Sequence, residues 1–181
     1  RPTVRHERAH VERIRHTREL QALADTERAA GHRVALVPTM GALHEGHLSL
    51  VAQAREHADR VWVSIFVNPT QFNEKADFES YPNDFEADWE ACSRAGADVV
   101  FTPSPAELYP DGSQTWVDVE RLSMPLCGAT RPGHFRGVAT VVGSAVDRTS
   151  PGVLGARGGA SSGLPRGGAK GCPLLDAATG L

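Results

Sequence analysis

Apolar residues in the first 142 positions follow two alternating patterns. The short runs that are rich in β-branched residues, typical of strands buried on both faces, are residues 33–37, 61–67 and 98–102. The segments with apolar residues at helical spacing are residues 11–30, 48–54 and 85–92. Strands and helices that alternate in this order predict an α/β fold, with a parallel sheet, flanking helices and right-handed crossovers. Ligands of such sheets bind at the carboxyl ends of the strands.

The pattern continues to Val142 and then changes. Residues 115–119 have the alternation of a further strand, and residues 131–137 have the composition of a polar turn that leads into a helix. From residue 143 onward glycine is frequent and aromatic residues do not occur. We therefore expect one folded domain over residues 1–142 and a Gly-rich tail over residues 143–181, which is disordered or the product of a frameshift.

Composition and charge narrow the partners that the chain is expected to have. The formal net charge of −3 gives no support for a nucleic-acid or membrane partner, and no apolar run approaches the roughly 20 residues that span a bilayer. The 3 cysteines form no Cys-x-x-Cys pair, so neither a zinc ribbon nor a disulfide framework is indicated. A cytoplasmic protein that binds small ligands is the expectation.

The segment after the first predicted strand has the chemistry of a phosphate site. Its residues are Pro38, Thr39, Met40, Gly41, Ala42, Leu43, His44, Glu45, Gly46 and His47. His44 and His47 are three residues apart where the chain enters a helix, so their side chains share one face. Free backbone N–H groups and the helix dipole favour an anion there, and imidazoles can donate hydrogen bonds to oxygens that gain charge. The segment predicts ATP binding with attack at the α-phosphate.

Other interpretations of the two histidines are weaker. They could be ordinary polar residues at a helix start, or part of a metal site, but no third ligand is nearby and no metal is predicted. Neither a Gly-x-x-x-x-Gly-Lys-Ser/Thr loop nor a Gly-x-Gly-x-x-Gly loop occurs before the tail.

Two further polar segments are candidates for substrate binding. Asn68 and Gln71 follow the second predicted strand, where their amides could bind a small polar substrate, although Asn68-Pro69 alone would indicate a simple turn. Residues 131–137 combine two arginines with His134 and fit either a carboxylate or phosphate site or a solvated loop.

Several motifs together resemble the pantoate-β-alanine ligase family of the nucleotidylyltransferase superfamily. Residues 38–47, followed by Leu-Ser-Leu-Val, are similar to that family's form of the His-x-Gly-His signature. The segment Val-Ser-Ile-Phe-Val-Asn-Pro-Thr-Gln-Phe at 63–72 is similar to its substrate-binding segment. Tyr-Pro at 81–82, Leu-Tyr-Pro-Asp-Gly at 108–112 and Arg-Pro-Gly-His-Phe at 131–135 follow in the family's order. The match extends to about Val142.

This resemblance implies a Rossmann-like nucleotide-binding domain and a two-step reaction. Pantoate attacks the α-phosphorus of magnesium ATP to give pantoyl adenylate and pyrophosphate, and β-alanine then displaces AMP to give pantothenate. By the same resemblance residues 40–47 line the ATP site, His44 and His47 act on the phosphates with His47 as proton donor, and Gln71, with Asn68, binds pantoate and β-alanine. Family members are expected to form homodimers.

The family's Gly-Glu-Lys-Asp motif and its smaller carboxyl-terminal domain do not appear in the sequence. Four functions therefore stay open: an active ligase, a truncated ligase that is inactive or impaired and only binds nucleotide, a nucleotide-binding module with another role, and a related adenylyl transferase for another carboxylate.

Overall fold

The computed structural model describes residues 11–120, 131–149 and 153–154. It contains one parallel sheet, in the order β1-β4-β3-β2-β5. The strands are β1 (Glu12–Ile14), β2 (Val34–Thr39), β3 (Arg60–Ile65), β4 (Val99–Phe101) and β5 (Val153–Leu154). The predicted α/β fold with a parallel sheet is confirmed.

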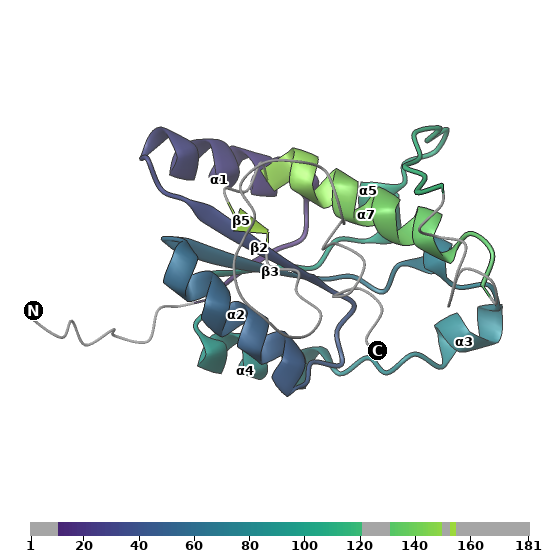
Figure 1. Cartoon of the computed structure of the whole chain (residues 1–181), viewed down its shortest axis with the longest axis horizontal. Coiled ribbons are helices and arrows are strands. Elements are labelled where there is room, and N and C mark those ends of the chain that lie inside the picture. The colour runs from purple at the N-terminus through teal and green to yellow at the C-terminus, as the bar shows by residue number, and fades with distance from the viewer. Residues whose placement is uncertain (1–10, 121–130, 150–152, 155–181) are drawn as a thin grey trace, which may run out of the picture.

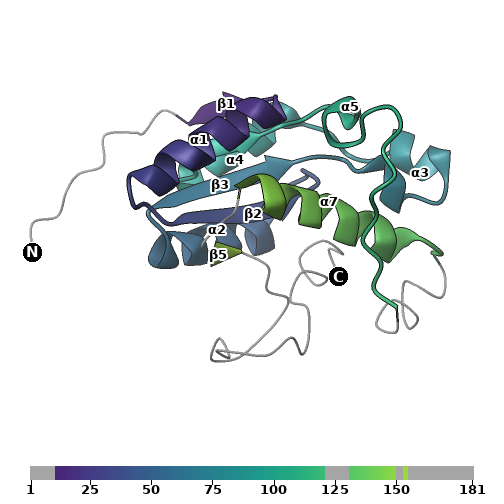
Figure 2. The ribbon, with the colours of Figure 1, turned by 90° about the horizontal axis from the view of Figure 1, so that it is seen from above.

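Helices cover both faces of this sheet. The long helices are α1 (Thr17–Ala29), α2 (Glu45–His57), α4 (Phe85–Ala95) and α7 (His134–Thr149). The short ones are the 3-10 turn η1 (Pro69–Gln71), α3 (Lys75–Glu79) and α5 (Pro105–Leu108). Helices α1 and α7 lie on one face and α2 and α4 on the other, while α3 lies beyond the carboxyl ends of the strands (Figures 1 and 2). Among the described residues no helix has the length and apolarity that crossing a membrane requires.

The two faces of the sheet have separate apolar cores because successive strand residues point to opposite sides. In β2, Ala35 and Val37 pack in the cluster under α2, whereas Val34 and Leu36 pack in the cluster under α1 and α7. Both faces of the central strands are thus buried, which explains why these strands have continuous apolar runs.

The predicted helix over residues 11–30 is wrong at its start. Residues 12–14 form the edge strand β1, which pairs in parallel with β4, and α1 begins only at Thr17. Val11 and Ile14 are buried against opposite faces of the sheet. A three-residue strand is too short for its alternation to stand out beside a longer helical pattern.

The predicted strand over residues 115–119 is also wrong. This segment has no regular secondary structure; Trp116 and Val117 are 40% and 43% exposed. It lies along α7, where the Val117 N–H donates to Thr140 Oγ1 at 2.9 Å and the Trp116 ring stacks on Tyr109. The segment thus contacts α7 without pairing in the sheet, and its alternating pattern does not correspond to one buried face, because residues 115–118 are all exposed.

The predicted end of the folded domain at Val142 is too early. Helix α7 continues through Gly143 to Thr149, with Ala145 and Thr149 buried. Residues 153–154 then form β5, which pairs in parallel with β2. A single glycine inside this helix has the same local signal as the start of a Gly-rich tail. The other residues of the predicted tail, 150–152 and 155–181, lie outside the described residues.

Glu107 stabilises the start of α1 from a distant part of the chain. The N-cap residue His16 makes no side-chain cap, and instead the Glu107 carboxylate accepts from Thr17 N at 2.9 Å and Thr17 Oγ1 at 3.0 Å. The Thr17 backbone N–H, with His16 and the Thr17 hydroxyl, lowers the pKa of Glu107 from 4.5 to about 2.

Replacing Glu107 with glutamine is expected to lower the free energy of unfolding by about 1 kcal/mol at pH 7, as losses of helix caps do. A carboxyl whose pKa is lowered on folding stabilises fully above its unfolded pKa and loses this contribution as pH falls through the folded value. The difference between wild type and Glu107→Gln in urea unfolding should therefore shrink between pH 4.5 and pH 2. An equal difference at pH 7 and pH 2 would contradict this assignment.

Candidate active site

A turn with two residues in the left-handed region joins β2 to α2. Gly41 has φ 83° and Ala42 has φ 52°. Thr39, the last residue of β2, fixes the entry to the turn, because its hydroxyl donates to Ser64 O at 2.8 Å and accepts from Gly41 N at 3.2 Å. The turn is thereby fastened to the end of β3, the neighbouring strand.

Asp88 of α4 holds the far side of the same turn. Its carboxylate accepts from the backbone N–H groups of Ala42 at 2.9 Å and Leu43 at 2.7 Å, and the residue is only 4% exposed. A Cβ on Gly41 would lie 2.8 Å from Asp88 Oδ2, so the turn has room for the carboxylate only because residue 41 is glycine. Asp88 was not among the predicted site residues. Its signal in the sequence was an acidic residue between Phe85 and Cys92 on the apolar side of a predicted helix.

His44 and His47 form a reciprocal cap at the start of α2. His44 Nδ1 accepts from Gly46 N at 3.1 Å, and His47 Nδ1 accepts from His44 N at 3.4 Å. The two ring centroids are 4.1 Å apart. The structure thus brings the two predicted histidines together, as their spacing indicated.

The environment of His47 favours its neutral form. Burial lowers its pKa below 6.5, the neighbouring His44 lowers it further, and the negative charge of Asp88 opposes both effects. For a histidine with a lowered pKa, the folded state binds the proton less readily than the unfolded state. Stability from this group is therefore complete above pH 6.5 and is lost as pH falls below that value.

The His47 imidazole is expected to titrate with a midpoint below 6.5. Proton NMR of the ring Cε1–H signal against pH measures this midpoint, and the signal is assigned by its disappearance in His47→Gln. A midpoint at or above 6.5 would contradict the described environment.

Asn68 organises the turn that follows β3. It is fully buried, and its Oδ1 accepts from Thr70 N, from Thr70 Oγ1 at 2.9 Å and from the Tyr109 hydroxyl at 3.0 Å. Its Nδ2 donates to Gly137 O at 3.0 Å and to Gln71 Oε1 at 3.2 Å. The amide of Asn68, which was predicted to bind substrate, is therefore hydrogen-bonded within the protein, and it orients Gln71.

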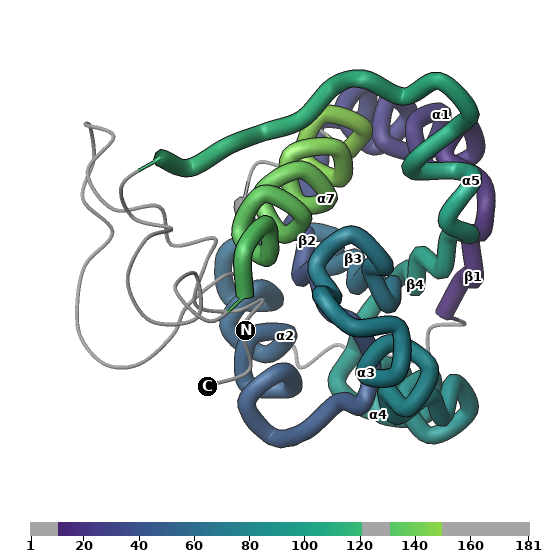
Figure 3. Tube along the Cα trace, turned by 90° about the vertical axis from the view of Figure 1, so that its right-hand side faces the viewer, coloured from purple at the N-terminus to yellow at the C-terminus, as the bar shows by residue number. Residues whose placement is uncertain are grey.

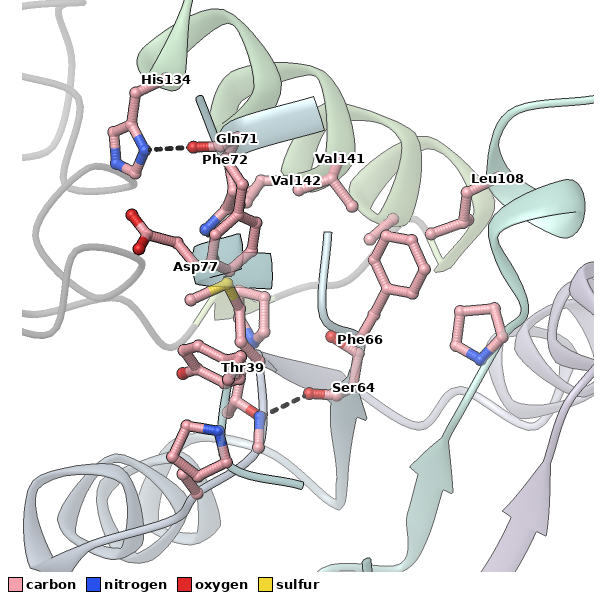
Figure 4. Close-up of a pocket in the computed structure, with 18 of the residues that line it drawn as sticks. Thr39, Ser64, Phe66, Gln71, Phe72, Asp77, Leu108, His134, Val141 and Val142 are labelled. Atoms are coloured by element: carbon pink, nitrogen blue, oxygen red, sulfur yellow. Dashed lines mark hydrogen bonds between the residues drawn. The ribbon is translucent and has the colours of Figure 1, made fainter. Parts of the chain in front are cut away.

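The start of α7 packs directly on this turn. His134 Nδ1 is hydrogen-bonded to Gln71 O at 2.9 Å, as Figure 4 shows. A Cβ added to Gly137 would lie 2.6 Å from Thr70 O and 2.8 Å from Gln71 N, so the helix approaches the backbone as closely as glycine permits. His134 and Gly137 thus support the Gln71 segment, a role that their sequence did not indicate, while Arg131 and His134 also line the cavity described next.

A cavity of about 690 Å³ opens between these elements, in the size range of small-molecule sites. The predicted site residues that line it are Pro38, Thr39, Met40, Gly41, Ala42, His44, His47 and Gln71. Those that do not line it are Leu43, Glu45, Gly46 and Asn68. Gln71 is 4% exposed, and its amide nitrogen contacts the Met40 sulfur across the cavity floor.

The two ends of the cavity differ in character. Phe66, Leu108 and Val141 line an apolar end between the sheet and α7, while Asp77 of α3 lies near the opposite end (Figure 4). Figure 3 views the molecule from the side of α3, with α2 and α7 on either side of β2. Within the part of the chain that the structure describes, no group of three or more His, Cys, Asp or Glu is placed to hold a metal ion.

Comparison with known proteins shows the family to which this chain belongs. The family model described as pantoate-beta-alanine ligase matches residues 12–154. The chain belongs to the pantoate-β-alanine ligase family. The resemblance found in the sequence is thus confirmed, and the match extends past Val142 into β5.

Relatives within this ligase family are similar over most of the chain. The pantothenate synthetase of Geotalea daltonii is 53% identical over 135 residues, which cover 75% of this chain and 48% of the relative. That of Myxococcus xanthus is 62% identical over 116 residues, 64% of this chain and 40% of the relative. The chain spans about half the length of the curated relatives that it matches.

Solved structures of the ligase family share the fold. Pantothenate synthetase from Thermus thermophilus superposes with a TM-score of 0.73 at 42% identity, covering 80% of this chain and 51% of that one. Pantoate-beta-alanine ligase from Francisella tularensis, complexed with beta-gamma ATP and beta-alanine, has a TM-score of 0.76 at 37% identity, covering 80% and 56%. The fold and the family are therefore established together.

Proposed function

We propose that this chain binds ATP in the cavity and carries out the ATP-dependent ligation of pantoate and β-alanine. The observation that carries the proposal is the reciprocal histidine cap, which places two imidazoles and the start of α2 at the edge of a cavity of about 690 Å³. The family membership supports it, since the family is a ligase family. The Francisella ligase with ATP and beta-alanine supports these two compounds as substrates.

The histidine cap determines which ring nitrogens are available to a phosphate. Each Nδ1 faces a backbone N–H donor, so each neutral ring carries its proton on Nε2. Both Nε2–H groups are then donors, and the start of α2 adds the positive end of a dipole. This arrangement suits the extra negative charge that phosphate oxygens gain during attack at the α-phosphorus.

The proposed reaction has two steps that balance. A pantoate carboxylate oxygen attacks the α-phosphorus of ATP, a new O–P bond forms, and the bond to the β-phosphate oxygen breaks to release pyrophosphate. The amine of β-alanine then attacks the activated carbonyl carbon, a C–N bond forms, AMP leaves and the amine loses its proton. Gln71 is proposed to bind pantoate and β-alanine, with Asn68 holding its amide in place.

Magnesium is proposed to enter as part of the substrate. Mg²⁺ in nucleotide sites keeps several waters and is bound by phosphates together with one or two carboxylates. His44 and His47 would then act on oxygens of the MgATP complex, and the protein needs no metal cage of its own.

The test uses the full 181-residue chain. Isothermal titration with MgATP measures binding, and pantoate-dependent release of pyrophosphate, with and without β-alanine, measures the two steps. Binding with pantoate-dependent release supports the proposal, whereas equal release with other carboxylates would favour a related transferase. Binding without release would favour a chain that only binds nucleotide, and no binding would overturn the proposal.

A further inference from the structure

The carboxylate of Asp88 occupies a backbone arrangement that can bind an anion. Two successive N–H groups, those of Ala42 and Leu43, converge on its two oxygens at 2.9 and 2.7 Å. Successive backbone N–H groups in a turn of this kind form an anion-binding nest. In this chain the nest is occupied from within, by a side chain that comes from α4, 46 residues further along.

The turn needs such a partner because its backbone is unfavourable for its sequence. Ala42, which is not glycine, has φ 52°, a conformation that side chains with a Cβ adopt at a cost. Without Asp88, two backbone N–H groups would also lose their acceptor. The residues that immediately follow the turn are those of the histidine cap, so the conformation at Ala42 determines where α2 begins.

We infer that Asp88 is a positioning residue, which holds the turn at Gly41 and Ala42 so that His44 and His47 face the cavity. The role of Asp88 in holding the turn does not depend on the proposed function, but the expected effect on MgATP binding does. Asp88 is buried, and among the described residues it makes no ion pair, so its charge is balanced mainly by the two N–H groups.

Asp88 has a second measurable effect, on the titration of His47. The groups near this pair are His44 beside His47 on α2, Cys92 on α4, and Tyr81 from the loop before α4. Burial raises the pKa of Tyr81 and of Cys92, and the negative charge of Asp88 adds to this effect. The same charge opposes the burial and the neighbouring His44 that lower the pKa of His47. Removal of that charge should therefore lower the titration midpoint of His47 without any ligand present.

The test compares Asp88→Asn with Asp84→Asn in the full chain. Both changes remove one negative charge from the first turn of α4 or its cap, and Asp84 only caps that helix through Ala87 N. In Asp88→Asn, the amide oxygen can accept one N–H while the amide NH2 faces the other donor. We expect the His47 midpoint to fall and MgATP to bind roughly 10-fold more weakly, with neither change in Asp84→Asn.

A third variant gives a direct test of the turn. Ala42→Gly removes the cost of positive φ, so adding it to Asp88→Asn should recover part of the lost MgATP affinity. If Asp88→Asn does not fold, Asp88→Glu replaces it; it should keep the His47 midpoint near that of wild type and still weaken MgATP binding.

Unchanged His47 midpoint and MgATP affinity in Asp88→Asn would overturn the inference, as would unchanged affinity in Asp88→Glu where that variant takes its place. The proposed function fails separately, if the wild-type chain does not bind MgATP. In that case the His47 midpoint and the backbone amide signals of residues 41–43 still decide whether Asp88 holds the turn.

Discussion

Gly137→Ala is expected to destabilise the chain by about 1–3 kcal/mol, as the insertion of a methyl group into a packed contact does. The new Cβ would lie 2.6 to 2.8 Å from backbone atoms of Thr70 and Gln71, which cannot rotate away as a flexible side chain would. The start of α7 must then shift, and the hydrogen bond from Asn68 to Gly137 O and the position of Gln71 shift with it. Urea unfolding followed by circular dichroism measures the loss.

Gly143→Ala is the matched control, because it makes the same change in the same helix. Among the described residues, a Cβ at this position would meet only Val117 Cγ2, at an ordinary 3.5 Å. Alanine is favoured over glycine inside a helix by roughly 1 kcal/mol, so this variant should be as stable as wild type or more stable. Equal effects of the two variants would contradict the close contact between α7 and η1.

His47→Gln is expected to weaken MgATP binding roughly 10- to 100-fold, the range for loss of one hydrogen bond to a charged group. Glutamine is chosen because it is favoured at the third position of a capping box, so it can replace the cap on His44 N while it removes the imidazole. Isothermal titration with MgATP at pH 7.5 measures the change. At this pH the wild-type imidazole is neutral, since its pKa lies below 6.5.

His57→Gln provides the comparison for this prediction. His57 is the exposed last residue of the same helix, away from the cavity. The His57→Gln variant should bind MgATP as wild type does. In urea unfolding, the free energy of unfolding of His47→Gln should lie within about 1 kcal/mol of that of wild type. An unchanged MgATP affinity in His47→Gln would remove the imidazole from the proposed site.

The central sheet was predictable because its signal is local. Strands buried on both faces require continuous apolar runs, so β2, β3 and β4 were identified within a few residues of their ends. The edge strand β1 was not, because its three residues are fixed by pairing with β4, and this pairing joins parts of the chain far apart in sequence. The strand predicted at 115–119 does not form for the opposite reason. Its alternating pattern is local, but the segment contacts α7 and does not pair with a strand of the sheet.

The candidate site likewise has a part that could be predicted from the sequence and a part that could not. Its contiguous part could be predicted, because a strand end, a glycine turn and two histidines at a helix start lie within ten residues and determine each other's positions. Asp88, His134 and Gly137 contact this part or the Gln71 segment across 45 to 69 residues of sequence. A local sequence pattern does not show which turn a distant side chain supports. For the same reason Asn68 was predicted to contact substrate, whereas its amide is hydrogen-bonded to Gln71 and to Gly137 O.

The claim that the histidine cap forms the ATP site is tested most directly by NMR titration of the full 181-residue chain with MgATP. We expect the largest changes at the backbone amides of Gly46 and His47 and at the ring signals of His44 and His47. His57 and the residues of β1 should remain unchanged. Saturable changes confined to other parts of the sheet, with the ring signals of both histidines unaffected, would contradict it.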